Sequence, residues 1–171
     1  VLFRSEAVGN RVLRICFEWN GCGNPLLVKR AAELAYKSGG NIKFDLKCWS
    51  EELSEALCGV SNRAAFDNLR MVAEEFKPLR VSPPLITATT LLVPGYVDEY
   101  EVEQISSFLA DIDPQIPYSL LVFHPDYLLT DLPVTSATQV ERCFQAARRH
   151  LKRVNVGNIE LLRYSEFNRF I

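Results

Sequence analysis

Strand-like and helix-like segments alternate along the whole of this chain. Apolar and β-branched stretches predict strands at residues 11–21, 41–47, 85–95, 118–123 and 153–158. Helical spacing, capping residues and Gly or Pro boundaries predict helices at residues 25–40, 50–59, 61–77, 98–112 and 136–151. Connections of this length are too long for hairpins, so the order favours the α/β class, with a parallel sheet and right-handed crossovers. An open doubly wound sheet and a barrel both fit this order.

The predicted strand IKFDLK (42–47) carries a charge at every second position. Alternation places its three apolar side chains on one face and Lys43, Asp45 and Lys47 on the other. Strands of parallel sheets are usually covered on both faces, where a charge is costly unless it is paired or used. The charges therefore favour a functional face, although an isolated Asp–Lys pair also suits a strand face that meets water.

Length and composition predict one globular domain without nucleic-acid or membrane partners. The 171 residues are 48% hydrophobic and 23% charged, which permits a substantial core. The net charge of −2 gives no reason to expect nucleic acid, and the basic cluster at residues 148–153 suits the end of a helix. The apolar runs are too short for a membrane span, and no signal peptide is visible.

The five cysteines and two histidines predict no metal site of their own. The number of cysteines is odd and their spacings match no zinc motif, which indicates free thiols in a reducing, cytoplasmic setting. His124 and His150 are far apart in the sequence, and HExxH does not occur. The phosphate-binding patterns GxGxxG and GxxxxGK are absent as well.

Polar residues gather where the predicted strands end. The carboxyl ends of parallel strands form one edge of a sheet, and this edge is the binding face in both candidate folds. Taken singly, Glu18 suits a solvated rim, His124 a loop and Trp19 packing. Their recurrence on successive strands favours a site for a charged or zwitterionic ligand. The residues at this edge are Glu18, Trp19, Asn20, Asp45, Lys47, Pro94, Gly95, His124 and Asp126.

Four stretches of the sequence share their order and spacing with one enzyme family. They are ICFEWNG (15–21), IKFDLK (42–47), TTLLVPGYVDE (89–99) and IPYSLLVFHPDY (116–127). Over residues 11–158 the chain thereby resembles radical S-adenosylmethionine enzymes of the pyruvate formate-lyase activating enzyme type. The resemblance implies a TIM-like, parallel-strand partial (β/α)6 barrel, truncated at the N-terminus, of which this chain would be the second half to two-thirds.

The resemblance also implies roles for individual residues. Asp45 and Lys47 would approach the amino-acid moiety of S-adenosylmethionine, and His124 would contact the same cofactor from the end of the last barrel strand. Asp45 would alternatively hold a monovalent metal cation beside the cofactor, together with Glu18. The chemistry is consistent, because Lys47 can meet a carboxylate and Asp45 an ammonium.

The sequence departs from the family pattern at three points. Trp19 stands where a small hydroxylic residue is usual, which counts against the cation site. The ending FHPDY (123–127) differs from that of a dedicated glycyl-radical activase and favours the less-characterised relatives. The CxxxCxxC motif that ligates the 4Fe–4S cluster is missing, as is the Gly-Gly-Glu strand, and the five cysteines do not substitute at their spacings.

The first five residues, VLFRS, have an unusual origin in our interpretation. A common sequencing-adaptor end encodes this peptide when translated, so we interpret residues 1–5 as an assembly artefact. Residues 6–171 would then be the C-terminal portion of a radical S-adenosylmethionine partial-barrel domain, with the cluster motif encoded upstream.

The implied function of the whole protein is that of a radical enzyme. A reduced 4Fe–4S cluster would cleave S-adenosylmethionine to a 5′-deoxyadenosyl radical, which would act on a glycyl-radical enzyme or an unknown substrate. Flavodoxin or ferredoxin would donate the electron, and the 171 residues alone would be inactive. Two alternatives stay open: a cluster-free binding or scaffold module, and an aldolase-like barrel with Lys47 as a Schiff-base lysine, which the neighbouring Asp45 disfavours.

Overall fold

The computed structural model describes residues 13–167, which form five strands and the helices between them. The strands are β1 (Phe17–Trp19), β2 (Ile42–Asp45), β3 (Ile86–Leu92), β4 (Tyr118–Val122) and β5 (Val154–Gly157). The connecting helices are α1 (Pro25–Ser38), α2 (Glu51–Cys58), α3 (Arg63–Glu75), α4 (Glu99–Ile112) and α5 (Ala137–Arg148). Each predicted strand and helix is confirmed, with shorter bounds. The interpretation of residues 1–5 concerns residues outside the described range.

The described residues end in a helical segment that the sequence patterns do not predict. It consists of the 3-10 turn η2 (Ile159–Leu161) and the helix α6 (Leu162–Phe167). Segments this short contain too few periodic positions to be recognised as helical. Among the described residues, no helix is long and apolar enough to cross a membrane.

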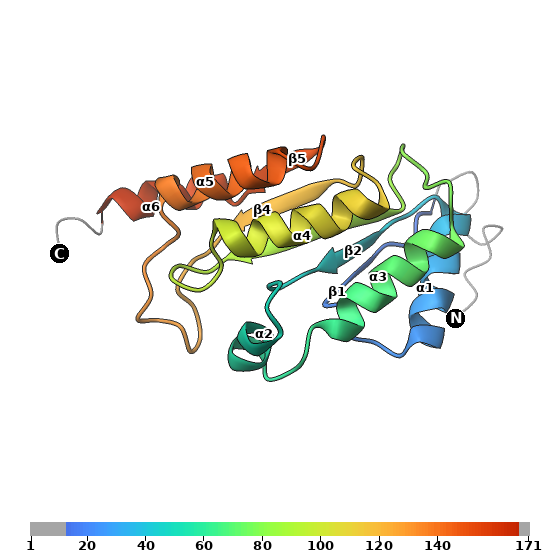
Figure 1. Cartoon of the computed structure of the whole chain (residues 1–171), viewed down its shortest axis with the longest axis horizontal. Coiled ribbons are helices and arrows are strands. Elements are labelled where there is room, and N and C mark those ends of the chain that lie inside the picture. The colour runs from blue at the N-terminus through green and yellow to red at the C-terminus, as the bar shows by residue number, and fades with distance from the viewer. Residues whose placement is uncertain (1–12, 168–171) are drawn as a thin grey trace.

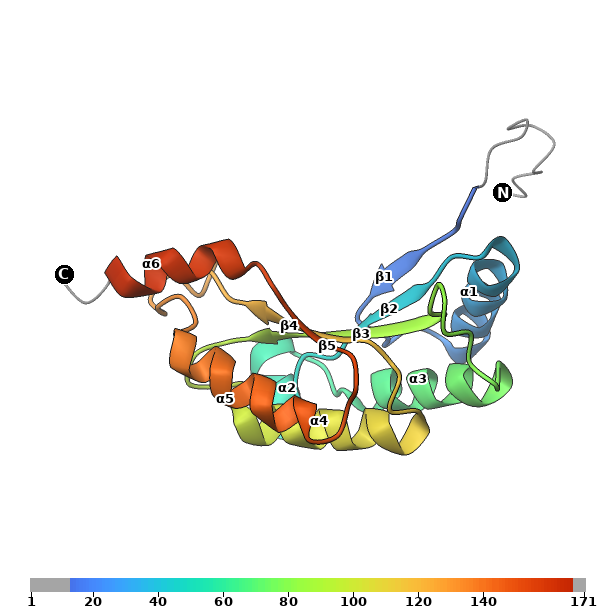
Figure 2. The same ribbon diagram turned by 90° about the horizontal axis from the view of Figure 1, so that it is seen from above.

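The sheet decides between the two candidate folds. Its strand order is β1-β2-β3-β4-β5, and every neighbouring pair is parallel (Figure 1). All five connecting helices lie on one side of the sheet, and α6 lies on the other (Figure 2). Successive right-handed crossovers in one direction place their helices on one face, whereas a doubly wound sheet reverses direction. The fold is therefore the α/β arrangement of a partial TIM-like barrel.

The helix-covered face of the sheet forms the core. Ile42 and Phe44 of β2 are fully buried there, beside Ala88 of β3 and Tyr118 of β4. Two polar side chains in this layer, those of Tyr118 and Thr90, form hydrogen bonds within the core. The Tyr118 hydroxyl donates to Thr90 Oγ1, and Thr90 Oγ1 donates to the Leu46 carbonyl, both at 2.7 Å. Burial raises the pKa of the Tyr118 hydroxyl above its usual range, which keeps it protonated as a donor.

The opposite face of the sheet is open and polar. The expectation that β2 is covered on both faces is wrong within the described residues, because the Lys43 and Asp45 side chains remain 33% and 29% exposed. Alternation along each strand explains how the two faces differ in polarity. In the observed register the side chains of this open face are Glu18, Lys43, Asp45, Thr87, Thr89, Leu91, Ser119, Leu121 and Asn155.

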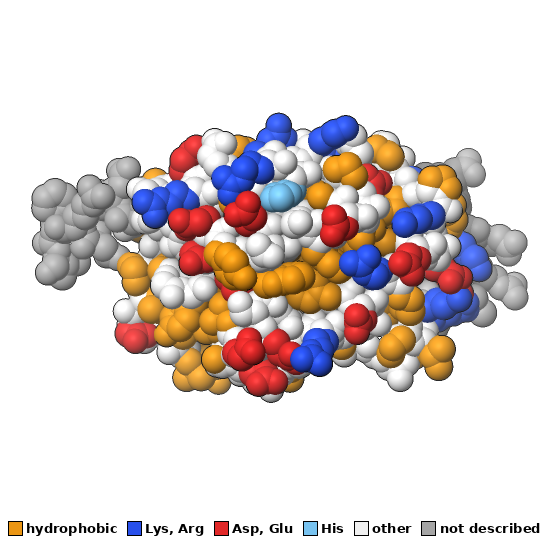
Figure 3. Space-filling model, in the orientation of Figure 1, with side chains coloured by type: hydrophobic (Ala, Val, Ile, Leu, Met, Phe, Trp, Pro, Cys, Tyr) orange, Lys and Arg blue, Asp and Glu red, His pale blue; other side chains and the backbone are white. Residues whose placement is uncertain are grey.

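The outer surface of the helix layer carries an aromatic cluster where α2, α3 and α4 meet. Figure 3 shows this surface as a hydrophobic strip with acidic side chains below it. The Trp49 and Phe66 ring centroids are 5.3 Å apart, those of Phe66 and Phe108 are 4.9 Å apart, and Arg70 lies over Phe108. An open groove of about 600 Å³ runs along these rings. Because the helix layer separates it from the open sheet face, we assign the cluster to helix packing.

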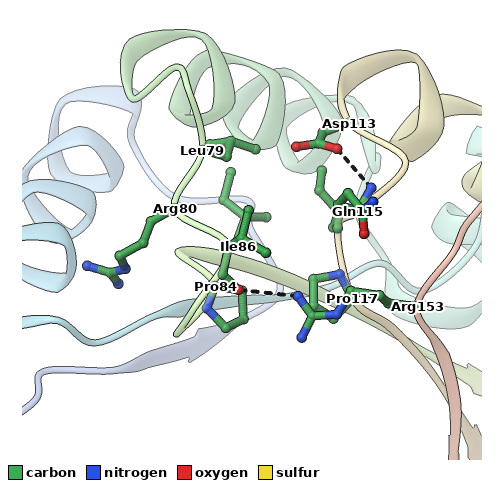
Figure 4. Close-up of a pocket in the computed structure, with 10 residues that line it drawn as sticks. Leu79, Arg80, Pro84, Ile86, Asp113, Gln115, Pro117 and Arg153 are labelled. Carbon is green, nitrogen blue, oxygen red and sulfur yellow. Dashed lines mark hydrogen bonds between the residues drawn. The ribbon is translucent and has the colours of Figure 1, made fainter.

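The Arg80 side chain joins two segments at the amino edge of the sheet. Arg80 donates to the carbonyls of Pro83 at 2.7 Å, Tyr36 at 3.0 Å and Gly40. It points toward α1 and away from a neighbouring hollow of about 10 Å³, into which no more than a water molecule fits (Figure 4). Arg80 thus connects the segments that precede β2 and β3.

We predict that Arg80→Ala lowers the free energy of unfolding by about 2–3 kcal/mol, because hydrogen bonds that a charged group donates contribute this much. Arg80→Lys should recover less than half of the loss, since one ammonium cannot reproduce the guanidinium fork. Urea denaturation measures both. Arg30→Ala, which removes an exposed pair with Glu33, is the control and should change stability by less than about 0.5 kcal/mol. Equal effects of the Arg80 and Arg30 variants would contradict the prediction.

Candidate functional site

Asp45 and Lys47 form an ion pair on the open face, at the carboxyl end of β2. The Lys47 ammonium donates to Asp45 Oδ2 at 2.5 Å. The Asp45 side chain is 29% exposed and the Lys47 side chain is 39% exposed. Leu46, between them, turns into the core and is 1% exposed. Strand alternation therefore presents both charges together on one face, as the sequence predicts.

The second oxygen of Asp45 has no hydrogen-bond partner among the described residues, although it is buried. Thr89 lies opposite Asp45 in the register of β2 and β3, and its buried Oγ1 also has no partner there. Buried polar atoms are normally paired, so two neighbouring exceptions point to a missing partner. A cation or an N–H donor between the two strands would satisfy the carboxylate oxygen, and a polar group would satisfy the hydroxyl.

Glu18 shares the open face but has its own partner. Its carboxylate forms an ion pair with Lys43, which lies opposite it in the register, and the Glu18 side chain is 69% exposed. The Trp19 ring packs against Phe44, 5.9 Å between centroids, and so lies on the helix-covered face. Within residues 13–167, no group of three or more His, Cys, Asp or Glu side chains could hold a metal ion. The cation site of Glu18 and Asp45 stays a prediction.

His124 lies at the same edge of the sheet but at a distance from the Asp45–Lys47 pair. It follows β4, where its Nδ1 is 3.3 Å from Asp126 Oδ2 and its ring meets Tyr164 of α6 edge-on. Because β3 stands between β2 and β4, about 10 Å separate the strands that carry these residues. Only an elongated ligand could touch both His124 and the pair.

A hollow of about 80 Å³ adjoins the Asp45–Lys47 pair, beyond the ends of β1 and β2. Its walls come from the β1–α1 loop, the β2–α2 loop, α2, the α2–α3 loop and the first turn of α3. Among the residues that line it are Asn20, Cys22, Asn62 and Phe66. The hollow thus extends the polar face toward the helix layer.

Side chains from two helices hold the loops around this hollow. Asn68 donates to the carbonyls of Gly21 and Gly23, at 2.8 and 2.9 Å. Asn62 donates to the carbonyls of Cys48 and Trp49, at 2.9 and 2.8 Å.

Glu101, 5% exposed on α4, holds the β2–α2 loop from another side. Its carboxylate accepts from the backbone N–H of Trp49 at 2.5 Å, and from the backbone N–H and the hydroxyl of Ser50. The backbone of this loop is therefore held through its carbonyls by α3 and through its amides by α4.

Sequence reasoning missed Thr89 and these loop-holding residues. The signal for Thr89 was its place on the polar face of the strand that follows the charged one. The signal for Asn68 was its position next to Leu69, on the apolar stripe of a helix. An amide side chain that is buried there needs hydrogen-bond partners. Glu101 reads from sequence as an ordinary acidic residue of a first helical turn.

Comparison with known proteins finds similarity both in sequence and in structure. The chain is 33% identical over 84 residues to an isethionate sulfite-lyase activating enzyme from Desulfovibrio desulfuricans, over 48% of this chain and 25% of that protein. It superposes on a domain of pyruvate-formate lyase-activating enzyme from Bacteroides vulgatus with a TM-score of 0.67 and 19% identity, covering 85% and 82% of the two chains. No protein-family model matches the sequence.

The resemblance to radical S-adenosylmethionine activating enzymes is confirmed. The structural match supports the partial-barrel fold, and the sequence match is to part of an activating enzyme. The matched region spans about a quarter of the length of the Desulfovibrio activating enzyme.

The cysteines of the described residues do not suit the iron–sulfur cluster of an activating enzyme. All five, which lie between residues 16 and 143, are free. Burial, with a smaller contribution from the Glu101 charge, raises the pKa of the Cys48 thiol to about 11. Burial likewise raises the pKa of Cys143 to about 12. Cluster ligands are thiolates, and these two buried thiols are held protonated.

We predict that stability falls as the pH rises above 9, the ordinary thiol pKa. The folded state holds the Cys48 and Cys143 protons more tightly than the unfolded chain does, so their contribution is complete below pH 9 and is lost as pH rises through about 11–12. The expected loss by pH 10 is about 1 kcal/mol per thiol.

Urea unfolding between pH 7 and pH 10.5 tests this prediction. Replacing Cys48 and Cys143 by Ala should reduce the alkaline slope, whereas Cys16→Ser, at an exposed position, should leave it unchanged. An unaltered slope in the double variant would contradict the assignment. A residual slope from Tyr118 is expected, because its pKa is raised as well.

Proposed function

We propose that this chain supplies the cofactor-binding sheet of a radical S-adenosylmethionine activating enzyme. In this proposal the Asp45–Lys47 pair binds the amino-acid end of S-adenosylmethionine. The observation that carries it is the buried Asp45 oxygen on the open face, which lies beside an ammonium and has no hydrogen-bond partner in the part of the chain that the structure describes. The resemblance to activating enzymes supports the choice of ligand.

The pair can accept a zwitterion without being broken. An ammonium has three donor hydrogens and a carboxylate has two acceptor oxygens, so one hydrogen bond between Lys47 and Asp45 leaves capacity on both. Lys47 would donate to the cofactor carboxylate, and Asp45 Oδ1 would accept from the cofactor ammonium. Thr89 Oγ1, next to Asp45 in the register, would hydrogen-bond the same end of the ligand.

The other proposed contacts follow from the geometry of the edge. His124 would meet the far end of the cofactor, since about 10 Å separate β4 from β2. The alternative in which Asp45 and Glu18 hold a monovalent cation would require Glu18 to leave Lys43.

The cofactor, when bound beside a reduced cluster, supplies the radical chemistry of the family. No step is assigned to a cluster on these residues, because the cysteines do not fit one. We also propose that residues 6–171 are the C-terminal portion of the barrel domain and that the protein is cytoplasmic. In this proposal the whole protein acts on a glycyl-radical enzyme or another substrate, and flavodoxin or ferredoxin donates the electron.

We predict that the 171-residue chain binds S-adenosylmethionine in calorimetric titration. Lys47→Met and Asp45→Asn should each weaken binding by about tenfold or more, because each removes a charged hydrogen-bond partner. Thr89→Val should weaken it less. Lys29→Met is the matched control, since it also removes a lysine from a carboxylate pair, 2.8 Å from Glu75 on α3, and should leave the affinity unchanged.

The same titration separates the proposal from its main alternative. A cluster-free scaffold module would show no saturable binding of S-adenosylmethionine by the wild-type chain. Equal affinity of the wild type and Lys47→Met would place the ligand elsewhere. Either outcome would overturn the assignment to the pair.

A further inference from the structure

Two asparagines of the α3 region hold the loops at which β1 and β2 end. We propose that Asn62 and Asn68 are positioning residues for the Asp45–Lys47 site. They would fix the two loops that form the walls of the adjoining hollow. This inference rests on the proposed function, and it concerns residues that make no proposed contact with the cofactor.

Asn62 occupies a helix start without capping it. It is the N-cap residue of α3, yet its side chain makes no hydrogen bond to the backbone of its own helix. Both amide hydrogens go instead to the Cys48 and Trp49 carbonyls, and the residue is 7% exposed. An N-cap asparagine normally stabilises its helix through its side-chain oxygen. Here the side-chain amide is directed at the segment immediately after Lys47.

Asn68 makes the equivalent contact with the other loop. It lies within α3, is 2% exposed, and donates to the Gly21 and Gly23 carbonyls on either side of Cys22. Asparagine is a poor residue for a helix interior, and its buried amide needs partners. The two carbonyls belong to a loop in which Gly21 has a φ of +79°, and a Cβ atom at this position would lie only 2.9 Å from the Phe44 ring, so the loop backbone passes close to β2.

Together the asparagines set the separation of the two loops. Asn62 fixes the backbone one residue beyond Lys47, and Asn68 fixes the backbone one residue beyond Asn20. Asn68 lies in α3 and Asn62 is the N-cap residue of the same helix, so the loops cannot shift independently while these contacts persist. Glu101 restrains the β2–α2 loop from α4. Functional groups held by packed elements keep their geometry better than groups on free loops.

The test combines affinity with a local measurement of loop order. Asn62→Ala and Asn68→Ala should each raise the dissociation constant of S-adenosylmethionine about tenfold, because the site must then be ordered on binding. Hydrogen exchange should become faster in residues 48–50 for Asn62→Ala and in residues 20–24 for Asn68→Ala. Both measurements are made at a temperature where each variant is fully folded.

Arg80→Ala is the matched control. It also removes side-chain hydrogen bonds to loop carbonyls, but at the amino edge of the sheet. It should lower stability without changing exchange in residues 20–24 and 48–50, and without changing the affinity. A purely structural role for the asparagines would predict the same unchanged affinity for them.

The possible outcomes are distinguishable. Faster exchange with unchanged affinity overturns the positioning role and leaves the proposed function standing. Unchanged exchange in the loops overturns the positioning role as well. No binding by the wild type overturns the proposed function, and this inference with it. If Asn68→Ala does not fold, Asn68→Ser and Asn62→Ala, the latter at the helix start, carry the same test.

Discussion

The connecting helices cover only one face of the sheet, and the rest of this structure depends on this constraint. Five parallel strands in sequential order bring α1 to α5 onto a single face. Each strand must then be apolar toward the helices and is free to be polar on the other side. The charges of IKFDLK are compatible with the fold for this reason. They occupy the face that the helices leave open.

The energetics of the open face favour a binding role over a stabilising one. Partly exposed ion pairs such as Glu18–Lys43 and Asp45–Lys47 contribute only about 0–1 kcal/mol to folding. Buried oxygens without partners, as in Asp45 and Thr89, are unfavourable. A face selected for stability alone would avoid them. A ligand with complementary charges would convert both features into favourable contacts, which is consistent with the resemblance to activating enzymes.

The two edges of the sheet are held in different ways. At the amino edge, Arg80 joins the segments that lead into the strands, around a hollow too small for a ligand. At the carboxyl edge, Asn62, Asn68 and Glu101 hold the loops around a larger hollow beside Asp45 and Lys47. This division follows the general rule for barrels, in which the amino edge serves stability and the carboxyl edge serves function.

The sequence by itself determined the five strands, the helices that connect them and the face that carries Asp45 and Lys47, because these depend on periodicity within a few residues. It also carried the family resemblance, through motifs that are local. Only the tertiary structure decided between the barrel and the doubly wound sheet, separated His124 from the Asp45–Lys47 pair by a strand, and gave Glu18 a lysine partner. Only the tertiary structure brought Asn68 into contact with the β1–α1 loop, 47 positions earlier, and Glu101 into contact with the β2–α2 loop, 51 positions earlier. Such contacts depend on how helices pack over the sheet, which no local pattern in the chain specifies.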